Sequence, residues 1–137
     1  MTTETAANRV TPRAPRNATR SRSANVLLWI GQVVAAAMFL MAGGSKLAGA
    51  APMVAMFATI GIGQWFRYLT GTIEVVSAVL LLIPSLAFFG AAALASTMAG
   101  AIFTHLFIIG GNPAVPIVLL AITAIVAWVR RPSFLTR

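Results

Sequence analysis

Residues 23–45 read SANVLLWIGQVVAAAMFLMAGGS and contain no charged side chain. A helix of this length extends about 35 Å at 1.5 Å per residue, which exceeds the roughly 30 Å hydrocarbon core of a bilayer. Two arginines, Arg20 and Arg22, lie directly before it. We therefore predict a first membrane-spanning helix over about 26–47, flanked by basic residues on its N-terminal side.

The rest of the chain shares this apolar character. Of its 137 residues, 59% are hydrophobic and 9% are charged, whereas soluble domains carry roughly 25% charged residues. So much apolar surface exceeds what the core of one small domain can bury, and it must face lipid. The chain has no cysteine, one histidine and two acidic residues, which excludes disulfides, thiol chemistry and iron–sulfur clusters. We predict neither a metal site nor a catalytic residue set.

Further apolar segments predict three more spans, over about 66–83, 86–109 and 114–129. Turn residues separate them, with Pro84-Ser85 between the second and third spans. The run Gly110-Gly111-Asn112-Pro113 separates the third span from the fourth.

The segment 48–66 has two interpretations. Apolar residues recur at helical spacing after Pro52, namely Met53, Met56, Phe57 and Ile60. The segment is either a fifth span or a short helix at the membrane interface. An odd number of spans would place the two arginine-rich chain ends on opposite sides, whereas the positive-inside bias favours the cytoplasm for both. We therefore predict an all-α four-helix transmembrane bundle with both termini cytoplasmic and an interfacial helix over 52–60.

Basic residues concentrate at the chain ends and produce a net charge of +8. Five of the nine arginines lie in the first 22 residues. We predict a disordered cytoplasmic tail over 1–24, a membrane domain over 25–131 and a short basic tail over 132–137. Such tails indicate contact with anionic lipid rather than with nucleic acid, since the first one lacks aromatic residues. A cleaved signal peptide is disfavoured because the apolar run is too long. We expect a multi-pass protein of the bacterial cytoplasmic (inner) membrane.

Four ionisable residues interrupt the apolar part of the chain: Lys46, Arg67, Glu74 and His105. In the four-span topology Lys46 and Arg67 lie at the outer ends of the first two spans. Glu74 lies about 10 Å deeper than Arg67, and His105 lies about 8 Å below the outer end of the third span. We therefore predict one polar cluster in the outer half of the bundle.

Glu74 is the costliest of these residues. A carboxylate near the middle of a membrane helix costs about 2.5–3.5 kcal/mol, so it should face the bundle interior. It shares a small or polar stripe with Arg67, Thr70, Gly71, Ser77 and Ala78. Two interpretations stay open: a structural ion pair with Lys46 or Arg67, or a site that binds a ligand or a proton.

The roles of the other three ionisable residues also have more than one interpretation. His105 either bonds a neighbouring helix or binds a polar headgroup such as a quinone carbonyl, because imidazole both donates and accepts hydrogen bonds. Lys46 and Arg67 could instead extend to the interface as isolated cations.

Small residues recur every fourth position in the third span, at Ala92, Ser96, Gly100 and Thr104. This pattern allows helix backbones to approach closely. We predict that it packs inside the bundle and that a leucine at Gly100 destabilises the fold. The alternative is that the pattern forms a dimer face.

Four stretches carry a resemblance: AGGSKL at 42–47, GIGQWFRYLTGTIE at 61–74, AVLLLIP at 78–84 and MAGAIFTHL at 98–106. Their order and spacing, over about residues 26–131, resemble the DoxX-like family of small four-helix membrane proteins. The resemblance implies a four-helix membrane domain linked to membrane redox metabolism. Related proteins include a small subunit of thiosulfate:quinone oxidoreductase and proteins of oxidative-stress complexes.

Three functions fit these observations. The first is an accessory membrane subunit, not a stand-alone enzyme, which binds a quinone-like or lipid molecule non-covalently through Lys46, Glu74 and His105. It would contact a redox partner subunit or further copies of itself. The second is an assembly or scaffold protein in which the polar cluster only fixes the fold. The third is a small proton-coupled exporter that uses Glu74.

Overall fold

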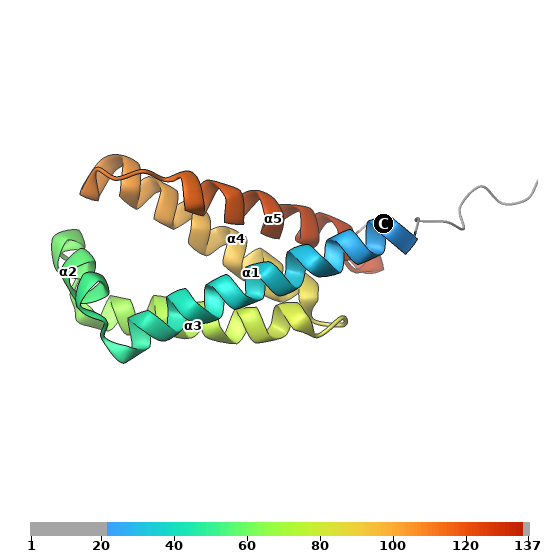
Figure 1. Cartoon of the computed structure of the whole chain (residues 1–137), viewed down its shortest axis with the longest axis horizontal. Helices are drawn as coiled ribbons and strands as arrows, with labels where there is room; N and C mark the ends of the chain where they lie inside the picture. The colour runs from blue at the N-terminus through green and yellow to red at the C-terminus, as the bar shows by residue number, and fades with distance from the viewer. Residues whose placement is uncertain (1–21, 136–137) are drawn as a thin grey trace, which may run out of the picture.

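The structure, a computed structural model, describes residues 22–135, and every regular element in this range is helical (Figure 1). The elements are α1 (Arg22–Ala48), α2 (Ala51–Ile60), α3 (Gln64–Leu82), α4 (Ala87–Thr104) with a π-helical turn (His105–Ile109), α5 (Ala114–Arg130) and a 3-10 turn (Ser133–Leu135). The predicted all-α class is confirmed.

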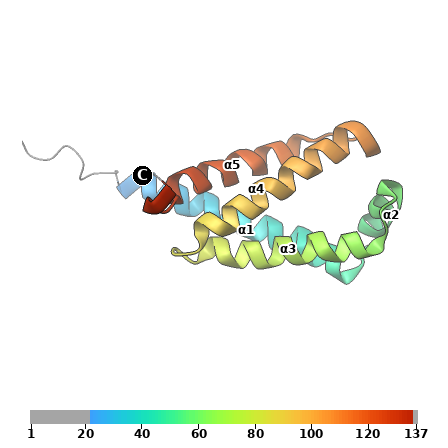
Figure 2. The same ribbon diagram turned by 180° about the vertical axis from the view of Figure 1, so that it is seen from behind.

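The helices form a bundle in which α3 packs against α1 and α4, and α4 also packs against α5. Contacts between α1 and α5 are far fewer. The start of α1 and the end of α5 lie together at one end of the bundle (Figure 1). The pair α1–α3 and the pair α4–α5 diverge toward the opposite end, where α2 lies (Figure 2). There α2 contacts α3, the π-helical turn and α1.

Three helical stretches are long and apolar enough to cross a membrane: Arg22–Ala48, Gln64–Leu82 and Ala87–Ile109. Helix α5 is also apolar but has 17 residues. The chain is therefore a helical membrane protein. Helix α2 has 10 residues and extends only about 15 Å, so the alternative of a fifth span over 48–66 is wrong. Its predicted apolar face is present, since Phe57 is buried while Met53, Met56 and Ile60 are half-buried.

The predicted boundaries of the tails differ slightly from the helix ends. Helix α1 begins at Arg22, so residues 22–24, assigned above to the tail, are helical. The remainder of that segment, residues 1–21, and the last two residues, 136–137, lie outside the described part of the chain.

Glycines set the distances between the helices. A Cβ added to Gly43 of α1 would lie 2.9 Å from the Gly71 carbonyl oxygen of α3. A Cβ added to Gly90 of α4 would lie 2.6 Å from the Ser77 carbonyl oxygen of α3. Backbones this close have no room for a side chain between them, so these glycines allow α1, α3 and α4 to pack tightly.

The packing predicted for Gly100 is wrong. A Cβ at Gly100 would meet no atom within 4 Å, and Gly100 and Ser96 are both exposed. The buried face of α4 is instead formed by Ala87, Gly90, Ala91, Leu94 and Met98. Small residues occur on several faces of this helix, so their spacing alone does not identify the face that turns inward.

Candidate functional site

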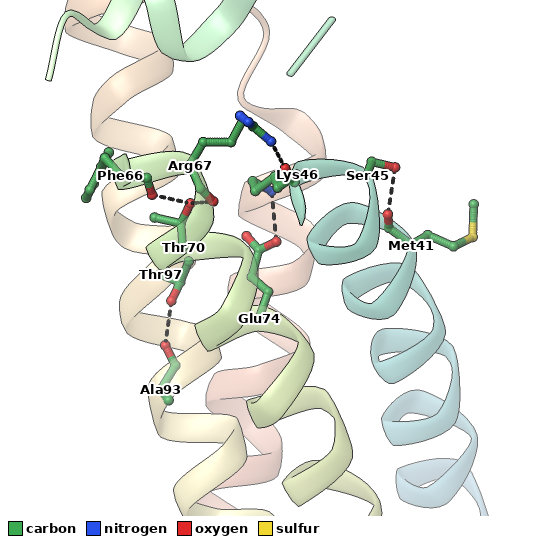
Figure 3. Close-up of polar contacts among 9 residues, drawn as sticks. All are labelled: Met41, Ser45, Lys46, Phe66, Arg67, Thr70, Glu74, Ala93 and Thr97. Atoms are coloured by element: carbon green, nitrogen blue, oxygen red, sulfur yellow. Dashed lines mark hydrogen bonds and ion pairs between the residues drawn. The ribbon is translucent and has the colours of Figure 1, made fainter. Parts of the chain in front are cut away.

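A buried ion pair joins α1 to α3 near the end of the bundle where α2 lies (Figure 3). Lys46 Nζ lies 2.8 Å from Glu74 Oε2, and the two side chains are 14% and 3% exposed. Of the two cations predicted as partners of Glu74, the structure pairs it with Lys46. The predicted stripe of α3 faces inward: Thr70 is half-buried, and the other members, Arg67, Gly71, Glu74, Ser77 and Ala78, are buried.

Close helix packing brings the two charged groups together. A Cβ added to Gly71, one turn before Glu74 on α3, would lie 2.9 Å from the Lys46 Cβ. Because Gly71 has no side chain, the end of α1 approaches α3 directly. The position of Lys46 therefore depends on the glycine contact as well as on the attraction between the charges.

Arg67 has a different role from the one expected of a second partner for Glu74. Its Nη1 donates a hydrogen bond to the Lys46 carbonyl oxygen, and its Nε donates to Gln64 Oε1 at 2.7 Å. The last carbonyls of a helix lack intrahelical donors, and positive charge is favourable at this end. Arg67 thus caps the C-terminal end of α1.

The interpretation that Lys46 and Arg67 extend to the interface as isolated cations is wrong. Arg67 is 3% exposed, and its guanidinium stacks over the Tyr68 ring with 4.2 Å to the centroid. The Lys46 ammonium is bound to Glu74. Both cations are therefore held by neighbouring helices.

His105 stands apart from the other three predicted residues. Among the described residues, no hydrogen bond or ion pair joins it to Lys46, Arg67 or Glu74. It begins the π-helical turn that ends α4, and its Nδ1 is buried without a hydrogen-bond partner. Turns of this kind occur often at functional sites. The structure therefore joins three of the four predicted residues, while His105 lies on the π-helical turn and makes none of these contacts.

A second polar cluster, which the sequence did not reveal, lies at the opposite end of the bundle. Gln32 of α1 is completely buried. Its Nε2 donates to the Leu81 carbonyl oxygen of α3 at 2.8 Å, and its Oε1 accepts from Arg130 Nε at 3.2 Å and Nη2 at 3.0 Å. One amide side chain thus connects α1, α3 and α5. The sequence feature that indicates this contact is that Gln32 is the one amide side chain between residues 26 and 45.

The ion pair retains unused hydrogen-bonding capacity. Within the described residues, Glu74 Oε1 accepts no hydrogen bond, and Lys46 Nζ donates only the one to Oε2. An ammonium has three N–H donors and a carboxylate oxygen accepts more than one bond. The pair is therefore equipped to bind one donor and one acceptor from a ligand. No group of three His, Cys, Asp or Glu side chains that suits a metal occurs in residues 22–135.

Comparison with known proteins identifies a family. The family model described as the DoxX-like family matches residues 30–127, more than half of the chain, and this range includes both polar clusters except for Arg130. No curated protein and no solved structure matches the chain.

Proposed function

Because the chain belongs to the DoxX-like family, we propose that it is a small accessory subunit of membrane redox or stress metabolism. In this role it has no enzymatic activity of its own and binds the polar headgroup of a quinone-like molecule at the Lys46–Glu74 pair. The observation that supports this proposal is the buried ion pair with one carboxylate oxygen and two ammonium protons unused.

The chemistry of the pair fits a headgroup that carries carbonyl and hydroxyl oxygens. Lys46 Nζ would donate to a carbonyl oxygen, and Glu74 Oε1 would accept from a hydroxyl. Such bonds are stronger in the low dielectric of a membrane interior than in water. The apolar tail of the ligand would remain in lipid. His105, whose Nδ1 has no partner, would be a second contact for a ligand that extends toward α4.

This proposal includes four spans with both chain ends in the cytoplasm of a bacterium. The 17 residues of α5 extend about 26 Å, within the range of short membrane helices. Arg22 begins α1 and Arg130 ends α5 at the same end of the bundle (Figure 1), which favours the cytoplasmic side for that end. Reporters fused at Gly49 and after Arg137 should then lie in opposite compartments, and the same compartment for both would refute this topology.

A second candidate is a scaffold protein in which the polar cluster only fixes helix packing. It is favoured by Arg67, which bonds the Lys46 carbonyl, and by the glycine contacts that surround the pair. The exporter hypothesis ranks third, because exchange of protons at Glu74 would require its release from Lys46.

One experiment separates the first two candidates. Native mass spectrometry of purified wild type should show a co-purified quinone-like molecule, and Glu74→Gln should lose it. The control is Gln32→Ala, which also removes a buried polar contact but at the opposite end, and it should retain the ligand. The scaffold would be supported instead if wild type carried no ligand and Glu74→Gln lowered the melting temperature. In that case, adding Lys46→Met to Glu74→Gln should restore part of the melting temperature.

A further inference from the structure

An apolar groove lies between α1 and α5, at the end of the bundle opposite the Lys46–Glu74 pair. Its volume is about 390 Å³. The residues that line it come from the first half of α1 and the second half of α5, and they include Leu27, Leu28, Gly31, Ile122, Ile125 and Val129. The groove exists because α1 and α5 contact each other much less than the long helices do in the pairs α1–α3, α3–α4 and α4–α5.

Arginines stand at one end of this groove on both helices. Arg22 begins α1 shortly before the first lining residues, and Arg130 and Arg131 directly follow Val129 of α5. The Arg130 guanidinium is held by Gln32. The Arg131 guanidinium stacks over the Trp128 ring at 4.3 Å from the centroid, which keeps it at the end of α5.

These cations have no carboxylate to neutralise them within the described part of the chain. Glu74 is the one acidic residue among 22–135, and it is bound to Lys46 at the other end of the bundle. Among residues 22–135, the groove therefore combines an apolar channel with a positive end that no carboxylate neutralises. A matching ligand has an apolar chain and an anionic head.

We infer that the groove binds one acyl chain of an anionic phospholipid, whose phosphate is held by Arg22 and Arg131. Guanidinium groups bind phosphate through paired, charge-assisted hydrogen bonds, and basic pockets between membrane helices bind anionic headgroups. A second copy of the chain is a poorer occupant, because it would bring its own arginines to the same end. This site is separate from the proposed headgroup site and does not depend on it.

Lipid retention tests the charged end. The full chain is placed in nanodiscs with equal amounts of phosphatidylglycerol and phosphatidylcholine, and native mass spectrometry measures the lipid that stays bound. We expect phosphatidylglycerol to be retained in preference. Arg22→Gln with Arg131→Gln should weaken its retention about five-fold per arginine. Arg9→Gln with Arg13→Gln removes the same charge from the N-terminal segment and should leave retention unchanged.

Filling the groove tests the acyl-chain contact. A Cβ at Gly31 would meet only Ile122 Cγ2, at 3.8 Å, so Gly31→Leu should place its side chain in the groove and abolish retention. The matched control is Gly100→Leu, which faces open space on α4 and should retain the lipid. The inference would be overturned if wild type retained both lipids equally, or if a variant and its control lost the lipid equally. It would also be overturned if wild type were a dimer and Gly31→Leu dissociated it.

Discussion

Helix α1 carries a polar contact toward each end, and the two contacts differ in what they leave unused. At Gln32 both polar atoms of a neutral amide are bonded, one to the Leu81 carbonyl and one to Arg130. At Lys46 an ion pair with Glu74 leaves one carboxylate oxygen without a donor in the described chain. The Gln32 contact uses both polar atoms of the amide to hold the helices together, whereas the Lys46–Glu74 contact leaves a whole carboxylate oxygen to which a ligand can bond.

The two contacts also differ in the free energy of unfolding that they control. Removing one partner of a buried ion pair leaves an uncompensated charge, which costs about 3–5 kcal/mol. Removing a buried neutral hydrogen-bonding group costs about 1–3 kcal/mol. Mutation of the Lys46–Glu74 contact should therefore lower stability more than mutation of the Gln32 contact, although the Lys46–Glu74 contact is the one with unused hydrogen-bonding capacity.

The largest effect is expected from Lys46→Met. Glu74 would remain buried without a cation, and we expect a loss of about 3–5 kcal/mol, measured as a lower melting temperature in detergent. The double variant with Glu74→Gln should recover part of this loss, because both charges are then absent. If the single and double variants melted at the same temperature, the loss would not come from the unpaired charge, and the charged contact would not be the costlier of the two to break.

The next effect concerns the glycines that support the two contacts. A Cβ at Gly90 would lie 2.7 Å from the Leu81 backbone nitrogen, beside the carbonyl that accepts from Gln32. Gly90→Ala should therefore cost about 1–3 kcal/mol through overpacking and leave the Lys46–Glu74 site intact. Gly71→Ala should cost a similar amount but also displace Lys46, so that ligand retention falls only in this variant.

A smaller loss is expected from Gln32→Leu. The leucine fills the space of the amide but leaves the Leu81 carbonyl and the Arg130 guanidinium without this partner, for a net cost of about 1–2 kcal/mol. Thermal melts measure the loss, and native mass spectrometry checks that the ligand at Lys46–Glu74 is retained. A loss as large as that of Lys46→Met would show that the neutral contact matters as much as the charged one.

The Lys46–Glu74 pair was predictable because it follows from the depth of the two residues in the membrane and from the free-energy cost of a buried carboxylate. A carboxylate in a membrane helix needs a nearby cation, and residue separations along α1 and α3 place Lys46 at a suitable depth. The contact of Gln32 with Arg130 was not predictable in this way, since 98 residues separate them and neither requires the other by charge. The separation of His105 was also missed, because the sequence does not show how the two helix pairs diverge around α2.

The helix boundaries were predictable because they depend on local sequence features, whereas the packing face of α4 was not predictable. The long uncharged run before Lys46 and the breaker residues after Ile109 determine where helices start and end. In α4, however, alanine, glycine and serine occupy several faces. Small residues permit close contact on any of these faces, so their spacing alone does not choose between them.

The smallest effect is expected from Gly100→Leu, which contrasts with the other glycine variants. Gly100 and Gly90 share α4, but a Cβ at Gly100 meets nothing within 4 Å, whereas Gly90 contacts the backbone of α3. Leucine also has a higher helix propensity than glycine and would face lipid at this position. We expect a change within about 0.5 kcal/mol of wild type, measured by thermal melting in detergent. A loss comparable to that of Gly90→Ala, together with a change in oligomeric state by native mass spectrometry, would instead show that this face of α4 packs against another molecule.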